Sequence, residues 1–303
     1  MAALIHIEQL SRHYGDRHAV AGIGFELQAG EVLGFLGPNG AGKSTTMQMI
    51  SGVLAPDSGR IRIDGIDLLR EPIRAKRALG YLPEEPPLYP EMRVDEYLAY
   101  CARLHAMTGP EIDPAVQRVK QRCGLEQVGR RVIGQLSKGY RQRVGIAQAI
   151  IHQPRVIILD EPTSGLDPNQ IQQIRHLVRE LAEECAILLS THILPEVQAL
   201  CDRVLILNQG RLVYSGQVTS QDHALLVTLG RDDDGQRLTD LPGINGVEPL
   251  GRQRFRLTLA PDTTADSISR AIVESGCALH GLQGDQDNLE RIFSQVTLGE
   301  AAA

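Results

Sequence analysis

The chain of 303 residues is long enough for one large α/β domain, or for a main domain with a small appendage, and too long for a single small module. Its 42% hydrophobic and 22% charged residues are typical of a folded globular protein and exclude a disordered or fibrous chain. Only 4% of the residues are aromatic, none is Trp, and the formal net charge is −6. This composition disfavours nucleic acid as the main partner.

The apolar segments of the chain are short. No run approaches the roughly 18–20 residues that a membrane-spanning helix requires, and the longest, near residues 156–159 and 186–189, have the length of strands. The N-terminus lacks the charged and apolar regions of a secretory signal, and the five cysteines are scattered along the chain. We therefore expect a protein of the reducing cytoplasm whose thiols are inert core residues.

The first 50 residues predict a small antiparallel edge followed by a strand, a loop and a helix. Alternating hydrophobic residues indicate two short strands on either side of the polar turn Tyr14-Gly15-Asp16. The apolar run at residues 32–36 predicts a buried strand. A glycine-rich turn then leads into a helical segment over residues 43–51.

The middle of the chain alternates between helical and strand patterns. Residues 94–123 and 139–152 are expected to be largely helical and to form an insertion. Residues 155–160 and 186–190 predict buried strands, and the amphipathic segment 170–183 between them predicts a helix. Strand, helix and strand in this order are typical of a parallel sheet.

The pattern changes after about residue 220. Residues 225–282 predict the element order β-α-β-β-α-β, and residues 288–296 predict a last helix. This order suggests a small ferredoxin-like α+β domain. The expected division is therefore a main domain at residues 1–220 and an accessory domain at residues 221–303.

Residues 37–44 fit the phosphate-binding pattern G-x-x-x-x-G-K-[ST] between an expected strand and an expected helix. The glycines of this pattern let backbone N–H groups surround a β-phosphate, Lys43 neutralises phosphate oxygens, and the Ser44 hydroxyl ligates Mg²⁺. The alternative, a chance match on an ordinary turn, is disfavoured by the strand–loop–helix context. We expect ATP to bind the consecutive residues Gly37, Pro38, Asn39, Gly40, Ala41, Gly42, Lys43, Ser44 and Thr45.

Two adjacent carboxylates, Asp160 and Glu161, follow an apolar strand. They come at the C-terminal end of that strand, where ligands of parallel sheets bind. We expect Asp160 to hold Mg²⁺ directly or through water, and Glu161 to act as the general base towards an attacking water. Alone, the pair would indicate a solvated acidic turn, but the phosphate-binding loop favours the catalytic interpretation.

Five motifs in this order make the chain resemble the ATP-binding cassette of ABC transporters. They are GPNGAGKST at Gly37, LPE at Leu82, LSKGYRQR at Leu136, VIILDEPTSGLDP at Val156 and LLSTH at Leu188, and they cover roughly the first 220 residues. The resemblance implies an α/β P-loop NTPase fold with a mostly parallel core sheet and an antiparallel β subdomain. It also implies a helical subdomain at about residues 86–152.

The same resemblance assigns further residues to the nucleotide. It implies that Tyr14 stacks on adenine and that His192, after an expected strand, donates a hydrogen bond to the γ-phosphate. A turn aromatic and a surface histidine are the alternatives. Ser137 and Gly139 of the signature loop are implied to serve the ATP of an opposite subunit, and Asp167 of the D-loop is implied to be a nucleotide-binding residue. Two complete sites then require a homodimer or a pair with a related cassette.

The sequence departs from the family's pattern at two places. Lys138 and Tyr140 replace the first Gly and the Gln of the usual LSGGQ, while the Ser and the second Gly that contact phosphate are retained. Glu84 stands where the family mostly has a Gln that ligates Mg²⁺ and links the core to the helical insertion. A carboxylate binds the ion more strongly but adds negative charge beside the two carboxylates of the site.

These observations predict an ATP-hydrolysing subunit that lies on the inner face of the cell membrane. The stretches LPEEPPLYPEM and LSKGYRQR resemble the ABC-2 type exporter branch. In that branch ATP closes a dimer and drives a separately encoded integral-membrane permease. The resemblance implies that residues 86–97 receive this permease. The rival is a soluble ABC ATPase acting on nucleic acid or ribosomes, which the absence of a second cassette, a coiled-coil insertion and a basic tail disfavours. A small-molecule sensor role of the C-terminal domain is compatible with the exporter.

Overall fold

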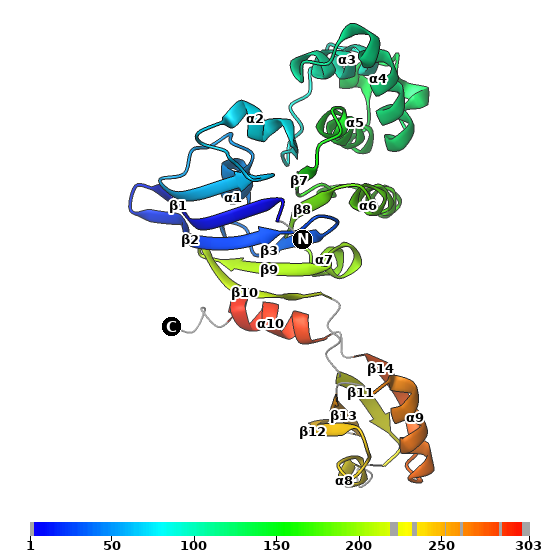
Figure 1. The fold of residues 1–303 in the computed structure, drawn as a ribbon. Helices are drawn as coiled ribbons and strands as arrows, with labels where there is room; N and C mark the ends of the chain where they lie inside the picture. Colours follow the sequence, from blue (N-terminus) through cyan, green and yellow to red (C-terminus); the bar gives the residue numbers. More distant parts are fainter. Residues whose placement is uncertain are drawn as a thin grey trace. The chain divides into compact units, whose positions relative to one another are not determined.

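The computed structural model describes residues 3–218, 224–231, 235–251, 253–260, 263–284 and 287–298. The chain divides into two units, Met1–Val218 and Thr219–Ala303, whose elements are labelled in Figure 1. The boundary expected after residue 220 falls within residues 219–223, outside the described residues.

The larger unit contains two sheets, a group of three helices, a further long helix and several short helices. In chain order its elements are β1 (Ile5–Tyr14), β2 (Arg17–Leu27), β3 (Val32–Leu36), α1 (Lys43–Ile50), β4 (Ser58–Ile63), β5 (Ile66–Asp67), α2 (Pro72–Arg77), β6 (Leu79–Leu82), α3 (Val94–Leu104), α4 (Gly109–Cys123), η1 (Glu126–Val128), η2 (Ile133–Gln135), α5 (Lys138–Ile150), β7 (Val156–Asp160), α6 (Pro168–Ala182), β8 (Ala186–Thr191), α7 (Leu194–Leu200), β9 (Arg203–Asn208) and β10 (Arg211–Gln217).

The six strands of the central sheet follow the order β10-β9-β3-β8-β7-β6. All neighbours from β9 to β6 run parallel, and β10 is antiparallel to β9 at the edge. Every residue of β3, β7 and β8 is buried, as their continuous apolar runs require in a sheet covered on both faces. The predicted α/β fold with a mostly parallel sheet is confirmed. The C-terminal ends of β3, β7 and β8 therefore meet at one edge of the sheet.

The core of the larger unit lies between the central sheet and an antiparallel sheet of order β2-β1-β4-β5. Met47 and Met49 of α1 pack among buried residues of both sheets. Phe25 of one sheet and Phe35 of the other meet edge to face, with ring centroids 5.1 Å apart. On the opposite face of the central sheet, a Cβ at Gly34 would lie 3.4 Å from the side chain of Val197 in α7 and 2.8 Å from the Sγ of Cys201, the residue after α7. The parallel strands are thus covered on both sides.

The helical insertion contains α3, α4 and α5, which contact one another. Residues 94–123 were expected to be largely helical, but the helix is interrupted at residues 105–108. Thr108 caps the start of α4, because the Thr108 backbone N–H donates to the Glu111 carboxylate at 2.7 Å. Gly124 ends α4 in the left-handed conformation. An ion pair of 2.7 Å between Lys120 and Asp95 joins α4 to α3. These contacts fix the two helices against each other.

The smaller unit has one four-stranded sheet of order β12-β13-β11-β14 with antiparallel neighbours. Its elements are β11 (Ala224–Leu229), α8 (Gly235–Leu238), β12 (Ile244–Gly251), β13 (Arg254–Leu259), α9 (Ala265–Glu274), β14 (Leu279–Gly284) and α10 (Asp287–Leu298). Ile268 and Ile272 of α9 pack with Leu238 of α8 on one face of the sheet. This order and pairing correspond to the split-βαβ arrangement.

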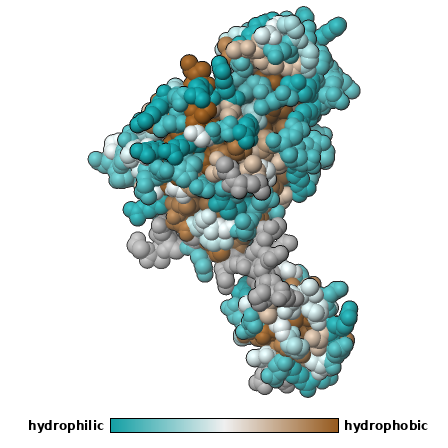
Figure 2. Space-filling model, viewed as in Figure 1, coloured by the Kyte–Doolittle hydropathy of each residue, from teal (hydrophilic) through white to brown (hydrophobic). Residues whose placement is uncertain are grey.

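The visible face of the larger unit is mostly hydrophilic, with hydrophobic residues exposed in places (Figure 2). Exposed apolar side chains on and beside α2 include Leu69, Ile73 and Val53. Within the described ranges no helix is both long and apolar enough to cross a membrane. All five cysteines are buried, as expected from the sequence.

We expect Gly80→Ala to destabilise the larger unit, because the new methyl group would lie 2.2 Å from the carbonyl oxygen of Ala149 in α5. Such overpacking costs about 1–3 kcal/mol in the free energy of unfolding, measurable by denaturant titration. The control is Gly109→Ala, where nothing lies within 4 Å of the new atom and the change should stay within about 0.5 kcal/mol. Equal stabilities of the two variants would contradict the close packing of β6 on α5.

Candidate nucleotide-binding site

The loop between β3 and α1 uses glycine where other residues would collide. A Cβ at Gly37 would lie 2.4 Å from the carbonyl oxygen of Leu207, and one at Gly42 would lie 2.4 Å from that of Ala19. Gly42 also has φ +103°, a conformation that side chains disfavour. The first turn of α1 is closed by the Thr46 hydroxyl, which donates to the Gly42 carbonyl at 2.8 Å. The glycine pattern of the motif is therefore a packing requirement.

Lys43 is buried at the start of α1, and its ammonium group is held by the loop itself. Its Nζ donates to the carbonyl oxygens of Gly37 at 2.8 Å and Pro38 at 3.2 Å, and lies 3.7 Å from Oε1 of Glu161. These contacts place a cation at the loop and the N-terminus of a helix, a combination that attracts phosphate.

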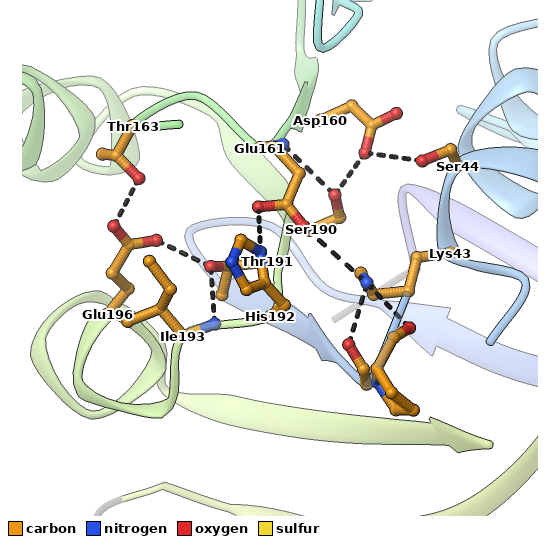
Figure 3. Close-up of polar contacts among 12 residues, drawn as sticks. Lys43, Ser44, Asp160, Glu161, Thr163, Ser190, Thr191, His192, Ile193 and Glu196 are labelled. Carbon is orange, nitrogen blue, oxygen red and sulfur yellow. Dashed lines mark hydrogen bonds and ion pairs between the residues drawn. The ribbon is translucent and has the colours of Figure 1, made fainter. Parts of the chain in front are cut away.

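The pairing of β7 with β8 sets Asp160 opposite Ser190. The Ser190 hydroxyl donates to Oδ1 of Asp160 and accepts a hydrogen bond of 3.2 Å from the backbone N–H of Glu161. The Ser44 hydroxyl donates to the same Asp160 oxygen at 3.4 Å (Figure 3). These two hydrogen bonds direct Asp160 from the central sheet towards α1. The burial of Tyr81 and the nearby negative charge of Asp160 raise the pKa of the Tyr81 hydroxyl.

Glu161 and His192 meet directly after adjacent strands. Nδ1 of His192 lies 2.8 Å from Oε2 of Glu161. The Glu161 side chain is only 9% exposed, whereas that of His192 is 45% exposed. Glu161 has φ +49°, which costs a non-glycine residue free energy, and its N–H donates to the Ser190 carbonyl at 3.1 Å. The carboxylate of a residue with a strained backbone is thus held between a buried lysine and a solvent-facing imidazole.

These groups surround a cavity of about 640 Å³. Its lining residues are Tyr14, Arg17, Ala19, Asn39, Gly40, Gly42, Lys43, Ser44, Thr45, Glu84, Glu161, Ser164 and His192. The sequence analysis missed Arg17, which donates to the Gly40 carbonyl at 3.1 Å, and Ser164. A cation beside the turn at Tyr14 was the available signal for Arg17, and the signal for Ser164 was its place inside the motif VIILDEPTSGLDP, three residues after Glu161.

Ser137, Gly139 and Asp167 do not line this cavity, and Gly139 and Asp167 both lie against Gln170. A Cβ at Gly139 would lie 2.5 Å from the side-chain oxygen of Gln170. The backbone N–H of Gln170 donates to the Asp167 carboxylate at 3.0 Å. Ser137 caps α5 by accepting from the Tyr140 N–H at 3.4 Å. The three residues therefore form a separate group at the N-termini of α5 and α6.

The oxygen groups near the cavity fit Mg²⁺ only in part. Within the described residues, no group of three or more His, Cys, Asp and Glu side chains is arranged to hold a metal ion. Ser44 and Asp160 bring two oxygens within 3.4 Å, and Glu84 lines the same cavity. Such an incomplete hard-oxygen set suits Mg²⁺, which is usually bound by one or two protein oxygens together with phosphates and waters.

Comparison with known proteins identifies the family. The model of the family described as "ABC transporter" matches residues 20–164. The linearmycin resistance ATP-binding protein LnrL of Bacillus subtilis is 33% identical over 97% of this chain and 98% of its own length. The chain belongs to the ATP-binding proteins of ABC transporters. It is therefore an ATPase that binds ATP, as its resemblance to the cassette predicted.

Other ABC proteins match the larger part of the chain. The bacitracin transport ATP-binding protein BcrA of Bacillus licheniformis is 36% identical over 70% of this chain and 69% of its own. A solved ATP-binding subunit of an ABC transporter is 31% identical, with a TM-score of 0.65 over 78% of this chain and 93% of that one. A dimeric bacterial ABC transporter cassette is 25% identical, with the same TM-score over 70% and 98%.

In this ABC protein, Lys43→Ala should weaken ATP binding about ten- to a hundred-fold, because a hydrogen bond to a charged group contributes roughly 1.5–3 kcal/mol. Titration with a fluorescent ATP analogue measures the affinity. Lys76→Ala is the control, since Lys76 contacts the Gly52 carbonyl outside the cavity. Equal affinities of the two variants would exclude a phosphate contact by Lys43.

Proposed function

We propose that the chain is the ATP-hydrolysing subunit of an ABC-2 type exporter that drives a separately encoded permease. The observation that carries the hydrolytic part is the contact of 2.8 Å between Glu161 and His192 beside Lys43. The export part is supported by relatives named for bacitracin transport and Nod factor export, and by the similarity to the linearmycin resistance protein over nearly the whole chain.

Hydrolysis at this site begins with a water that Glu161 deprotonates. The water oxygen forms a bond to the γ-phosphorus, the bond from that phosphorus to the bridging oxygen breaks, and ADP leaves with the bridging oxygen. One carboxylate oxygen of Glu161 is engaged by His192, and the other faces Lys43. His192 donates a hydrogen bond to the transferred phosphoryl group, while Lys43 neutralises its charge.

Ser44, Asp160 and Glu84 are the residues that would hold Mg²⁺ in this reaction. The ion would supply positive charge at the phosphate oxygens as charge develops on the leaving group. Ser190 supports this arrangement because its hydroxyl fixes the Asp160 oxygen that faces Ser44. Tyr14, half exposed at the rim of the cavity, offers a ring face to the adenine.

The separate group of Ser137, Gly139 and Asp167 would act on a second nucleotide. Because these residues lie outside the chain's own cavity, a complete site requires the cavity of one cassette and the signature loop of another. The simplest assembly is a head-to-tail homodimer, or a pair with a related cassette. The relative solved as a dimeric ABC transporter cassette supports such a pairing.

The surface at residues 86–97 is suited to a permease segment. Tyr89 is 45% exposed and contacts the rings of Tyr97 and Tyr100 at centroid distances of 6.0 and 5.8 Å. The Tyr97 hydroxyl donates to the Pro87 carbonyl at 3.1 Å, which ties the loop to α3. Docking there would hold the ATPase on the inner face of the membrane.

Purification of the tagged chain from detergent-solubilised membranes of its own host tests the transporter assignment. We expect a multi-span protein in stoichiometric amount, identified by mass spectrometry. Recovery of the chain alone, or together with ribosomes or DNA, would overturn the assignment to an exporter and leave the ATP chemistry in place.

Glu161→Gln should bind ATP normally and accumulate as a dimer, because the amide keeps the shape of the side chain but cannot accept the proton of water. Loss of a general base lowers turnover about 10²–10⁴-fold. Phosphate release measures turnover, and size-exclusion chromatography with ATP measures the dimer. The control Glu183→Gln alters an exposed carboxylate at the end of α6. Turnover at the normal rate would remove Glu161 from the role of base.

Glu84→Gln should raise the Mg²⁺ concentration that supports half-maximal ATPase activity, because a neutral amide oxygen binds a hard cation more weakly than a carboxylate. The measurement is a Mg²⁺ titration at saturating ATP. Glu85→Gln is the matched control, since the neighbouring Glu85 does not line the cavity. Identical titrations for Glu84→Gln and the unaltered protein would contradict a metal-binding role for Glu84.

A further inference from the structure

Glu196, in the first turn of α7, is a buried carboxylate that the reaction above does not use. It is 2% exposed, and no ion pair to it occurs among the residues that the structure describes. A buried carboxylate without a cation is costly unless hydrogen bonds satisfy it. The hydrogen-bond partners of Glu196 therefore indicate its role.

Both carboxylate oxygens of Glu196 accept hydrogen bonds from buried threonines. The Thr163 hydroxyl donates to Oε1, and the Thr191 hydroxyl donates to Oε2 at 2.7 Å. Thr191 also accepts from the backbone N–H of Ile193 at 3.1 Å. Figure 3 shows these contacts beside the pair of Glu161 and His192.

The two threonines belong to the two segments that carry that pair. Thr163 lies two residues after Glu161, and Thr191 directly precedes His192. The backbone of Glu161 has φ +49°, and the Ser164 N–H closes the following turn onto the Glu161 carbonyl at 3.1 Å. A segment in such a conformation is retained only when its surroundings fix it.

We propose that Glu196 is a positioning residue of the hydrolysis site. By binding Thr163 and Thr191 with one carboxylate, it joins the segment after β7 to the C-terminal end of β8 and so fixes the separation and direction of Glu161 and His192. This inference rests on the proposed function for the roles of those two residues. Glu196 itself does not line the cavity, so it is not placed to contact the nucleotide.

The position of Glu196 predicts an effect on turnover rather than on ATP affinity. Most of the expected phosphate contacts come from residues 37–45, none of which bonds to Glu196 or to either threonine, whereas His192 is expected to act on the phosphoryl group as it is transferred. Misplacing catalytic groups by about 1 Å can lower the rate about a hundred-fold. Loss of the Glu196 contacts should therefore lower kcat and leave KM unchanged.

The test compares Glu196→Leu, which removes both acceptors, with Glu196→Gln, whose amide can still pair with two rotatable hydroxyls. We expect Glu196→Leu to lower kcat about ten- to a hundred-fold with unchanged KM and ATP affinity. Glu196→Gln should stay near the rate of the unaltered full-length protein. Glu183→Leu is the surface control. A folded Glu196→Leu protein with normal kcat, or with kcat and ATP affinity reduced together, would overturn the proposal.

Thr163→Val and Thr191→Val keep the side-chain shape, and each removes one hydroxyl donor to Glu196. These two variants test the proposal if Glu196→Leu does not fold. Each should lower kcat on its own. In the Glu196→Gln background each should again lower it, because the amide preserves the contacts. Normal kcat in both single variants would overturn the proposal.

Isotope-labelled histidine gives a readout independent of activity. In nuclear magnetic resonance spectra of the free protein, the His192 imidazole signals, assigned with His192→Gln, should shift in Thr191→Val and Glu196→Leu while those of the other eight histidines stay in place. Unchanged His192 signals would overturn the positioning role. Normal turnover of Glu161→Gln would instead overturn only the proposed base, so the two failures are distinguishable.

Discussion

β8 pairs in parallel with β3 on one side and with β7 on the other, and the groups of the site reach one cavity because of that pairing. The registers set Leu36 opposite Thr191, and Asp160 opposite Ser190. The phosphate-binding loop, the two carboxylates and His192 then leave the sheet at the same edge. A shift of β8 by one residue would turn the buried hydroxyl of Ser190 away from Asp160.

The end of the sheet is also the place where the larger unit buries most of its interacting polar side chains. Asp160, Glu161, Ser190 and Thr191 are buried at the ends of β7 and β8 or directly after β7, and Glu196 is buried in the first turn of α7. They are tolerable there because they satisfy one another: Ser190 bridges Asp160 and Glu161, and Glu196 binds two threonines. Networks of this kind strengthen in a low-dielectric interior when they are complete and are costly when they are not. The same bonds therefore stabilise the strand ends and orient the site.

Motifs whose chemistry is local could be predicted from the sequence, and contacts that depend on packing could not. The glycines of the loop, Lys43 and the pair Asp160-Glu161 are recognisable because neighbours in the chain define their geometry. Glu196 gave no such signal: it meets Thr163 only because α7 returns beside the segment after β7, 33 residues away in sequence. The division of residues 94–123 at Thr108 was visible as Thr-x-x-Glu, but the continuous helical pattern on both sides concealed it.

The separation of Ser137, Gly139 and Asp167 from the cavity gives the proposed dimer its energetic basis. A ligand shifts a conformational equilibrium only by its differential affinity for the two states. A nucleotide contacted by one chain alone would bind the open and closed assemblies equally and would not shift the equilibrium between them. A γ-phosphate that meets Lys43 and His192 from one chain and the signature loop from another binds the closed assembly better, and its hydrolysis removes that advantage. If His192 and Glu161 act at the same phosphate as proposed, the contacts that orient them would restrict hydrolysis to the closed state.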